Sequence, residues 1–99
     1  MDELKAVLDK IRSISNAEKL VVYGLKREGA SDRVRGVSVC VIADTDDKTA
    51  LESRLYLEIE SDIAFGVLIY TPSEWERLLS DPQSYASRIA EKGREYGEA

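Results

Sequence analysis

The sequence predicts a small α/β (α+β) domain in which a mixed sheet of about three strands carries helices packed on it. Three short runs rich in aliphatic and β-branched residues, at 20–23, 37–42 and 63–70, have the composition of buried strands. Segments with apolar residues at helical spacing precede, separate and follow them, which gives the order α-β-β-α-β-α-α. A chain of 99 residues has room for one domain, which we place at residues 1–99.

The first half of the chain is predicted to hold one helix and two strands. Residues 2–14 carry apolar side chains on one helical face and charged side chains on the other. The first strand, 20–23, ends at Gly24, and the second occupies 37–42. Residues 25–35 are polar and charged, so we expect a loop or a short irregular helix there.

The second half is predicted to hold three helices and one strand. An aspartate-rich segment, 44–47, ends the second strand and can cap a helix at 48–61. A strand follows at 63–70. Thr71–Glu74 has the pattern of a capping box with proline at the first helical position. Asp81–Pro82 repeats the cap-then-proline pattern, and we expect the last helix to start there.

Composition excludes several classes of function. The chain has 19 acidic and 14 basic residues, and a net charge of −5 disfavours a nucleic-acid partner. It has no apolar run near the ~20 residues of a membrane span and no secretory signal at its start, so we expect a cytoplasmic protein without a membrane partner. One cysteine and no histidine exclude an internal disulfide, a zinc finger and histidine-based nucleophilic chemistry.

Two single residues have a structural and a functional interpretation. Cys40 lies on a predicted strand, and no neighbouring feature would lower the pKa of its thiol, so we expect an inert core residue. Trp75 is expected to pack inward from its helix, and the alternative is an anchor in a protein interface.

One group of basic residues is the densest concentration of positive charge in the sequence. It consists of Lys26, Arg27, Arg33 and Arg35. These side chains could bind one small anion, such as a phosphate, or an acidic partner. The alternative is that they only keep a loop solvated.

Several turn motifs follow one another in a fixed order between residues 5 and 97. Gly24 ends the first strand, and Gly29 follows five residues later. The later motifs are Tyr70–Trp75, Asp81–Pro82, Arg88–Ile89 and Glu91–Gly93. With the element order, this frame resembles the minimal nucleotidyltransferase (MNT) domains of the DNA polymerase β superfamily. The resemblance implies a nucleotidyltransferase-like fold, in which Gly24, Leu25 and Gly29 are the remnant of the phosphate-binding loop.

The residues that perform catalysis in that family are missing. The family's serine after the first glycine corresponds to Leu25, a bulky apolar residue that we expect to obstruct the phosphate loop. The two aspartates of its Asp-x-Asp motif correspond to Gly36 and Ser38, and its third aspartate falls at or next to Gly66. Such carboxylates hold the metal ions that neutralise charge during phosphoryl transfer. The resemblance therefore implies degenerate positions with no catalytic residue and no metal site.

The resemblance leaves three functional interpretations. The first is a pseudoenzyme without a cofactor, an antitoxin-like or regulatory module that binds a protein partner or forms a homodimer. The second is an active nucleotidyltransferase that has relocated its acidic ligands to Asp32 or to 44–47. This enzyme would need Mg²⁺ and a nucleoside triphosphate and would transfer a nucleotide to a protein or small molecule. The third is a structural or regulatory module of another family, in which the Gly24 loop would not face Gly36 and Gly66.

Overall fold

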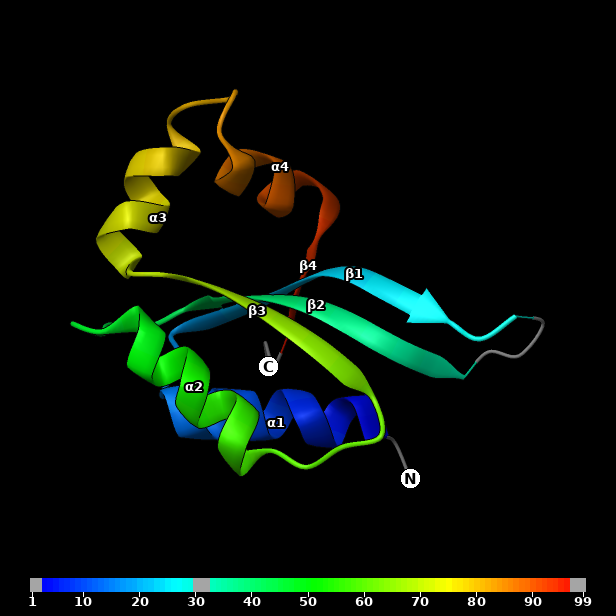
Figure 1. Cartoon of the computed structure of the whole chain (residues 1–99). Coiled ribbons are helices and arrows are strands. Elements are labelled where there is room, and N and C mark those ends of the chain that lie inside the picture. The colour runs from blue at the N-terminus through cyan, green and yellow to red at the C-terminus, as the bar shows by residue number, and fades with distance from the viewer. Residues whose placement is uncertain (1–2, 30–32, 97–99) are drawn as a thin grey trace.

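A computed structural model of the chain describes residues 3–29 and 33–96, which form four helices and a four-stranded sheet (Figure 1). In chain order the elements are α1 (Glu3–Ser15), β1 (Lys19–Arg27), β2 (Val34–Ile42), α2 (Lys48–Glu58), β3 (Ala64–Tyr70), α3 (Pro72–Leu79), α4 (Tyr85–Lys92) and β4 (Arg94–Tyr96). The predicted class and order are confirmed, with β4 as an additional strand at the end.

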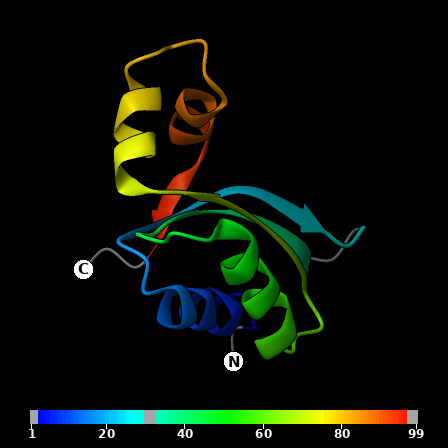
Figure 2. The same cartoon turned by 60° about the vertical axis from the view of Figure 1, so that its left-hand side comes forward.

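The sheet is mixed and has helices on both faces. Its strand order is β3-β2-β1-β4, in which β1 is antiparallel to β2 and β4, and β2 is parallel to β3. Helices α1 and α2 lie on one face, and α3 and α4 lie on the other (Figures 1 and 2). We call these the α1/α2 face and the α3/α4 face.

Strand β2 contributes to a hydrophobic core on each face. Val39 and Val41 belong to the core under α1 and α2, whereas Cys40 and Ile42 belong to the core under α3 and α4. This follows from the alternation of side chains along a strand that is covered on both sides. Trp75 is 5% exposed and belongs to the second core, so the packing interpretation of this residue is confirmed.

Residues 25–27 and 34–35 differ from the loop or short helix that the sequence predicts for 25–35, of which 30–32 lie outside the described residues. Strand β1 continues to Arg27 and β2 already begins at Val34, so both strands extend into a hairpin. The extension is polar because much of it is solvent-exposed, and polar side chains are compatible with a strand that is not covered. A lack of alternating apolar residues therefore does not exclude a strand at 25–27 and 34–35.

Two further expectations are corrected near the C-terminus. Strand β4, three polar or aromatic residues long, was not predicted, because its conformation comes from antiparallel pairing with β1. The last helix begins at Tyr85 with Ser84 as its cap, whereas Asp81–Pro82 forms a turn before it. The Asp81 carboxylate accepts a hydrogen bond from the amide of Gln83 over 2.9 Å, which stabilises that turn.

The other predicted helix caps are confirmed. Asp47 caps α2 by accepting a hydrogen bond from the amide of Ala50 over 3.0 Å. Thr71 and Glu74 form a capping box at the start of α3, in which Thr71 N donates to the Glu74 carboxylate over 2.9 Å. Glu74 also pairs with Lys48 at 2.6 Å, which joins the first turn of α2 to that of α3. The hydrogen bond from Lys48 and that from Thr71 lower the pKa of Glu74 from 4.5 to about 2.

Gly93 carries the chain from α4 on one face to β4 at the edge of the sheet. A Cβ atom built at this position would lie 2.5 Å from Val21 Cγ1 and 2.8 Å from the carbonyl oxygen of Ile89. Because both distances are shorter than real Cβ contacts, only glycine fits this crossing. A Cβ atom at Gly66, in contrast, would meet nothing within 4 Å.

We predict that Glu74→Gln destabilises the domain and reduces the pH dependence of its stability. Folding lowers the pKa of Glu74, so its ionised form contributes stability that is fully present above pH 4.5 and lost as the pH falls toward 2. The difference in unfolding free energy between the wild type and Glu74→Gln should therefore shrink from pH 7 to pH 3, as measured by urea denaturation. Glu76→Gln, an exposed neighbour, is the control. The same difference in unfolding free energy at pH 7 and at pH 3 would contradict the prediction.

We predict that Gly93→Ala lowers the free energy of unfolding by about 1–3 kcal/mol, because the added methyl group overlaps β1 and the end of α4. Gly66→Ala, where the methyl group meets open space, is the matched control and should cost little. Chemical denaturation of both variants measures the difference. Equal stability of the two variants would show that the crossing is not constrained in this way.

Candidate functional site

The positions at which the resemblance leads us to expect a phosphate loop and catalytic carboxylates lie together on the sheet. Gly24 on β1 pairs with Ser38 on β2, and Ser38 pairs with Gly66 on β3. Gly36 lies two residues before Ser38 and therefore on the same face. These residues line a hollow of about 390 Å³ on the α3/α4 face. We call it the glycine hollow.

The glycine hollow lacks the groups that hold a divalent metal ion. None of the described residues that line it carries a carboxylate, and Ser38 offers only a neutral hydroxyl group. Mg²⁺ in proteins depends on carboxylates together with substrate phosphates. Residues 3–29 and 33–96 also contain no group of three or more acidic or cysteine side chains placed to hold a metal ion. The residues of the hollow therefore do not fit a catalytic Mg²⁺ site.

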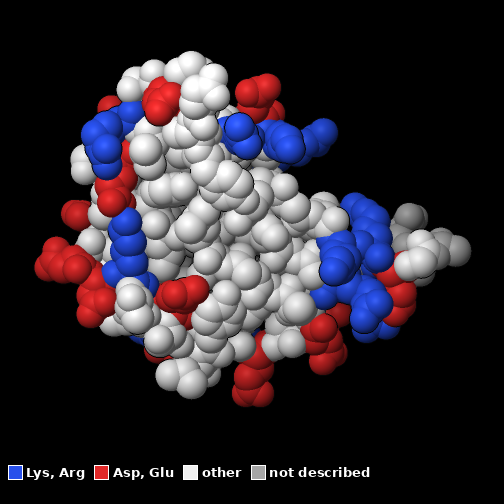
Figure 3. Space-filling view, turned by 45° about the horizontal axis from the view of Figure 1, so that its top comes forward, with Lys and Arg blue, Asp and Glu red and all other residues white. Residues whose placement is uncertain are grey.

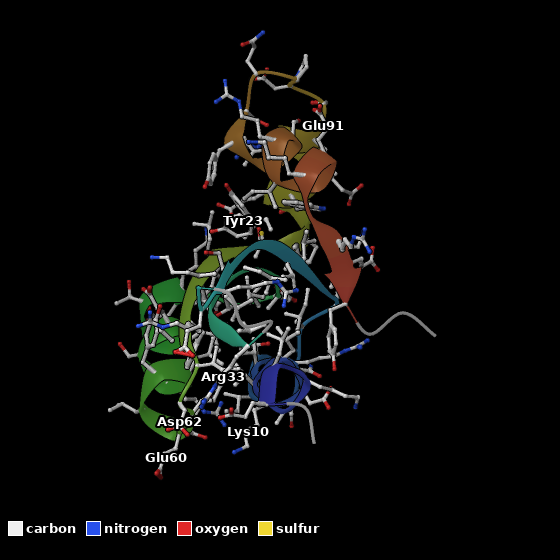
Figure 4. All side chains as sticks on the ribbon, turned by 90° about the vertical axis from the view of Figure 1, so that its right-hand side faces the viewer. Lys10, Tyr23, Arg33, Glu60, Asp62 and Glu91 are labelled. Carbon is white, nitrogen blue, oxygen red and sulfur yellow. The ribbon has the colours of Figure 1, made fainter. Side chains whose placement is uncertain are left out.

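The cations proposed to bind an anion are divided between different surfaces. Lys26 lines the glycine hollow, but Arg33 and Arg35 line a separate hollow of about 320 Å³. The acidic residues in that second hollow are Glu3, Glu28 and Asp62. Figure 4 shows Arg33 on the same side of the sheet as Asp62. The positive charge around the hairpin end (Figure 3) is thus partly offset by neighbouring carboxylates and does not converge on the glycine hollow.

The residues that the resemblance assigns to a phosphate loop, Gly24, Leu25 and Gly29, lie on strand β1 and shortly after its end. Leu25 pairs with Val37, whose side chain lies in the α1/α2 core. Leu25, which is 45% exposed, therefore points to the α1/α2 face, and it is also among the residues that line the glycine hollow. Gly29 has a φ of +38°, a conformation that favours glycine.

The candidate relocated ligands lie at the other end of β2. Asp44, Asp46 and Asp47 line a hollow beyond this end, together with Arg54. Eight residues separate Asp44 from Gly36, a distance of roughly 25 Å at ~3.3 Å per residue. Asp47 is the cap of α2. The other candidate, Asp32, lies outside the described residues.

A cluster of tyrosines beside Cys40 was not found from the sequence. Tyr23 and Tyr85 meet edge to face with ring centroids 6.3 Å apart, although 62 positions separate them. Figure 4 shows Tyr23 between the sheet and the α3/α4 helices. Burial is the main cause that raises the pKa of Tyr23 and that of Cys40 to about 12. Cys40 is completely buried, as expected for an inert core residue.

A further and more apolar hollow, of about 540 Å³, lies between α1 and the outer edge of β1. Its apolar lining comes from Leu4, Leu8, Val22, Leu25 and Tyr96. The Tyr96 hydroxyl donates a hydrogen bond to Asp9 over 2.8 Å, which fixes β4 to α1 at one end of the hollow. We call it the β1 groove. Sequence analysis missed it because it depends on β4, which has no sequence signal of its own.

Comparison with known proteins gave no match: no family model, no curated protein and no solved structure matches the chain. Within residues 3–29 and 33–96, no helix has the length and apolar character needed to cross a membrane.

We predict that Cys40 does not react with a thiolate-specific reagent while the domain is folded. The side chain is fully buried and burial raises the pKa of the thiol, so both access and the thiolate fraction are low. At pH 8, urea above the unfolding transition should accelerate the reaction by at least about a hundredfold. The rate of reaction with a chromogenic disulfide reagent measures this. A fast reaction in native buffer would contradict the burial of β2 under α3 and α4.

Proposed function

We propose that this chain is a nucleotidyltransferase-like domain that has lost its metal-binding carboxylates and works by binding another protein, as an antitoxin-like or regulatory module. Its partner is a second protein or a second copy of the chain, not nucleic acid. It uses no metal or nucleotide cofactor and acts in the cytoplasm.

The glycine hollow is the observation that carries this proposal. Gly24, Ser38 and Gly66 occupy neighbouring positions on three strands, where the resemblance requires a phosphate loop and carboxylates to meet. This arrangement supports the nucleotidyltransferase-like frame over a module of another family. The identity of the residues supports the loss of catalysis, because glycine has no side chain and serine no negative charge.

The chemistry of nucleotidyl transfer explains why these positions matter. Catalysis of phosphoryl transfer is almost entirely positioning and electrostatic stabilisation, for which metal ions neutralise the developing charge. Two ions about 3.5–4 Å apart need several carboxylates at the same place. The nearest acidic cluster by sequence, 44–47, lies beyond the far end of β2 and includes the cap of α2. This separation favours the pseudoenzyme over an enzyme with relocated ligands.

We predict that the wild-type domain shows no Mg²⁺-dependent binding of ATP in calorimetric titration, because the glycine hollow has no metal ligand. The enzyme alternative predicts Mg²⁺-dependent labelling by ATP that Asp44→Asn abolishes. Metal-dependent binding or such labelling would overturn the proposal.

Matched variants make this result informative. A triple variant with Gly36→Asp, Ser38→Asp and Gly66→Asp should gain Mn²⁺ binding, since neighbouring strands are about 4.8 Å apart and the glycines have space for a side chain. The corresponding triple asparagine variant has the same shape without the charge and should gain none. If both triple variants bind no metal, the hollow does not have the geometry that the resemblance implies.

A further inference from the structure

The outer edge of β1 is only partly covered. Strand β4 pairs with Leu20, Val21 and Val22, whereas β1 continues to Arg27. On its other side β1 pairs with β2 as far as Arg27. Beyond Val22 the outer edge of β1 therefore has no neighbouring strand among the described residues. Alternate residues of such an edge direct their N–H and C=O groups sideways, where another strand can pair with them.

The β1 groove runs beside this uncovered edge. Leu25 and Val22 point into it from β1, and Leu4 and Leu8 line it from α1. A strand added to the edge would alternate its side chains between the two faces of the sheet. Every second side chain would enter the apolar groove, and the others would lie on the α3/α4 face beside Lys26, which pairs with Gly36 there.

The surroundings of the edge are positively charged, although the whole chain has a net charge of −5. Lys92 and Arg94 line the groove, and Lys26 lies on the edge itself. None of these three cations has an ion-pair partner among residues 3–29 and 33–96. The acidic residue that lines the groove, Glu95, is paired with Lys19 at 3.6 Å. The local charge therefore favours an acidic occupant.

We propose that the edge of β1 from Gly24 to Arg27 binds an extended acidic peptide segment of a partner protein as an added strand. Apolar side chains of the peptide enter the β1 groove, and its acidic side chains lie on the opposite face beside Lys26. Lys92 and Arg94, which line the groove, add long-range attraction for the acidic segment. This inference rests on the proposed protein-binding function and names the chemistry of the partner. A second copy of the chain fits less well, because antiparallel pairing of two β1 edges would bring their Lys26 and Arg27 side chains together.

A fluorescent eight-residue peptide of alternating glutamate and valine tests the proposal by anisotropy titration with the full chain. Two comparison peptides separate the contribution of backbone hydrogen bonds from that of negative charge. Methylation of alternate backbone nitrogens removes the donors of an added strand and should weaken binding at least about tenfold. Replacement of every glutamate by lysine should weaken it to a similar extent.

Variants of the protein locate the site. Leu25→Asp places a charge in the apolar groove and should weaken peptide binding at least about tenfold, whereas Leu57→Asp, at an 82% exposed position on α2, should not. Lys26→Glu should weaken binding about fivefold, with Lys10→Glu on α1 as its matched control. Both test positions are exposed, and unfolding midpoints verify that the variants fold.

Three outcomes would overturn the proposal. The first is an affinity for the acidic peptide of about 1 mM or weaker. The second is that the N-methylated peptide binds as tightly as the unmodified peptide, or that the Leu25→Asp variant binds the peptide as tightly as the wild type. Either result would show that the strand edge is not the site. The third is that light scattering finds a dimer of the wild type and a monomer of the Leu25→Asp variant. This result would mean that a second copy of the chain occupies the edge. If the peptide does not bind and Mg²⁺-ATP does not bind either, only this surface is wrong, whereas Mg²⁺-dependent ATP binding would overturn the proposed function itself.

Discussion

The close approach of the chain to β1 at Gly93 is the constraint on which the functional surfaces of this domain depend. The chain leaves α4 on one face of the sheet and must reach the sheet edge within one residue, past Val21 and Val22. Strand β4 then pairs with β1 only from Val22 back to Leu20 and is held to α1 by the bond between Tyr96 and Asp9. Because the crossing occurs at that point, no described strand pairs with the rest of the outer edge of β1.

The same arrangement explains why the glycine hollow and the β1 groove differ in chemistry. Helices α3 and α4 cover one end of their sheet face through Trp75 and Ile89, and the small residues Ser38 and Gly66 lie beyond them. Without carboxylates, the glycine hollow is a shallow neutral surface next to Lys26. The β1 groove is more apolar, and Lys92 and Arg94 beside it have no ion-pair partner in the part of the chain that the structure describes. Exposed apolar residues beside a strand edge are typical of a surface that another chain covers.

The parts of the fold that could be predicted are those with local signals. The capping box at Thr71 and the cap at Asp47 are encoded within a few residues, and the alternation around Cys40 placed it in a core. Strand β4 was not predictable in this way, because its strand conformation depends on pairing with the distant β1. The strand ends at 25–27 and 34–35 are exposed and polar, so they lack the apolar pattern of a buried strand. The sequence also could not show that Lys26 lines one hollow while Arg33 and Arg35 line another, because this separation depends on the tertiary fold.

Amide hydrogen exchange of the free domain, followed by NMR, tests the central claim most directly, because exchange reports which backbone N–H groups lack a partner. We expect slow exchange from Leu20 to Val22, where β2 and β4 both pair with β1. From Gly24 to Arg27 we expect fast exchange at alternate amides, those directed away from β2. Uniformly slow exchange along the whole of β1 would mean that its outer edge is already covered and would contradict the account.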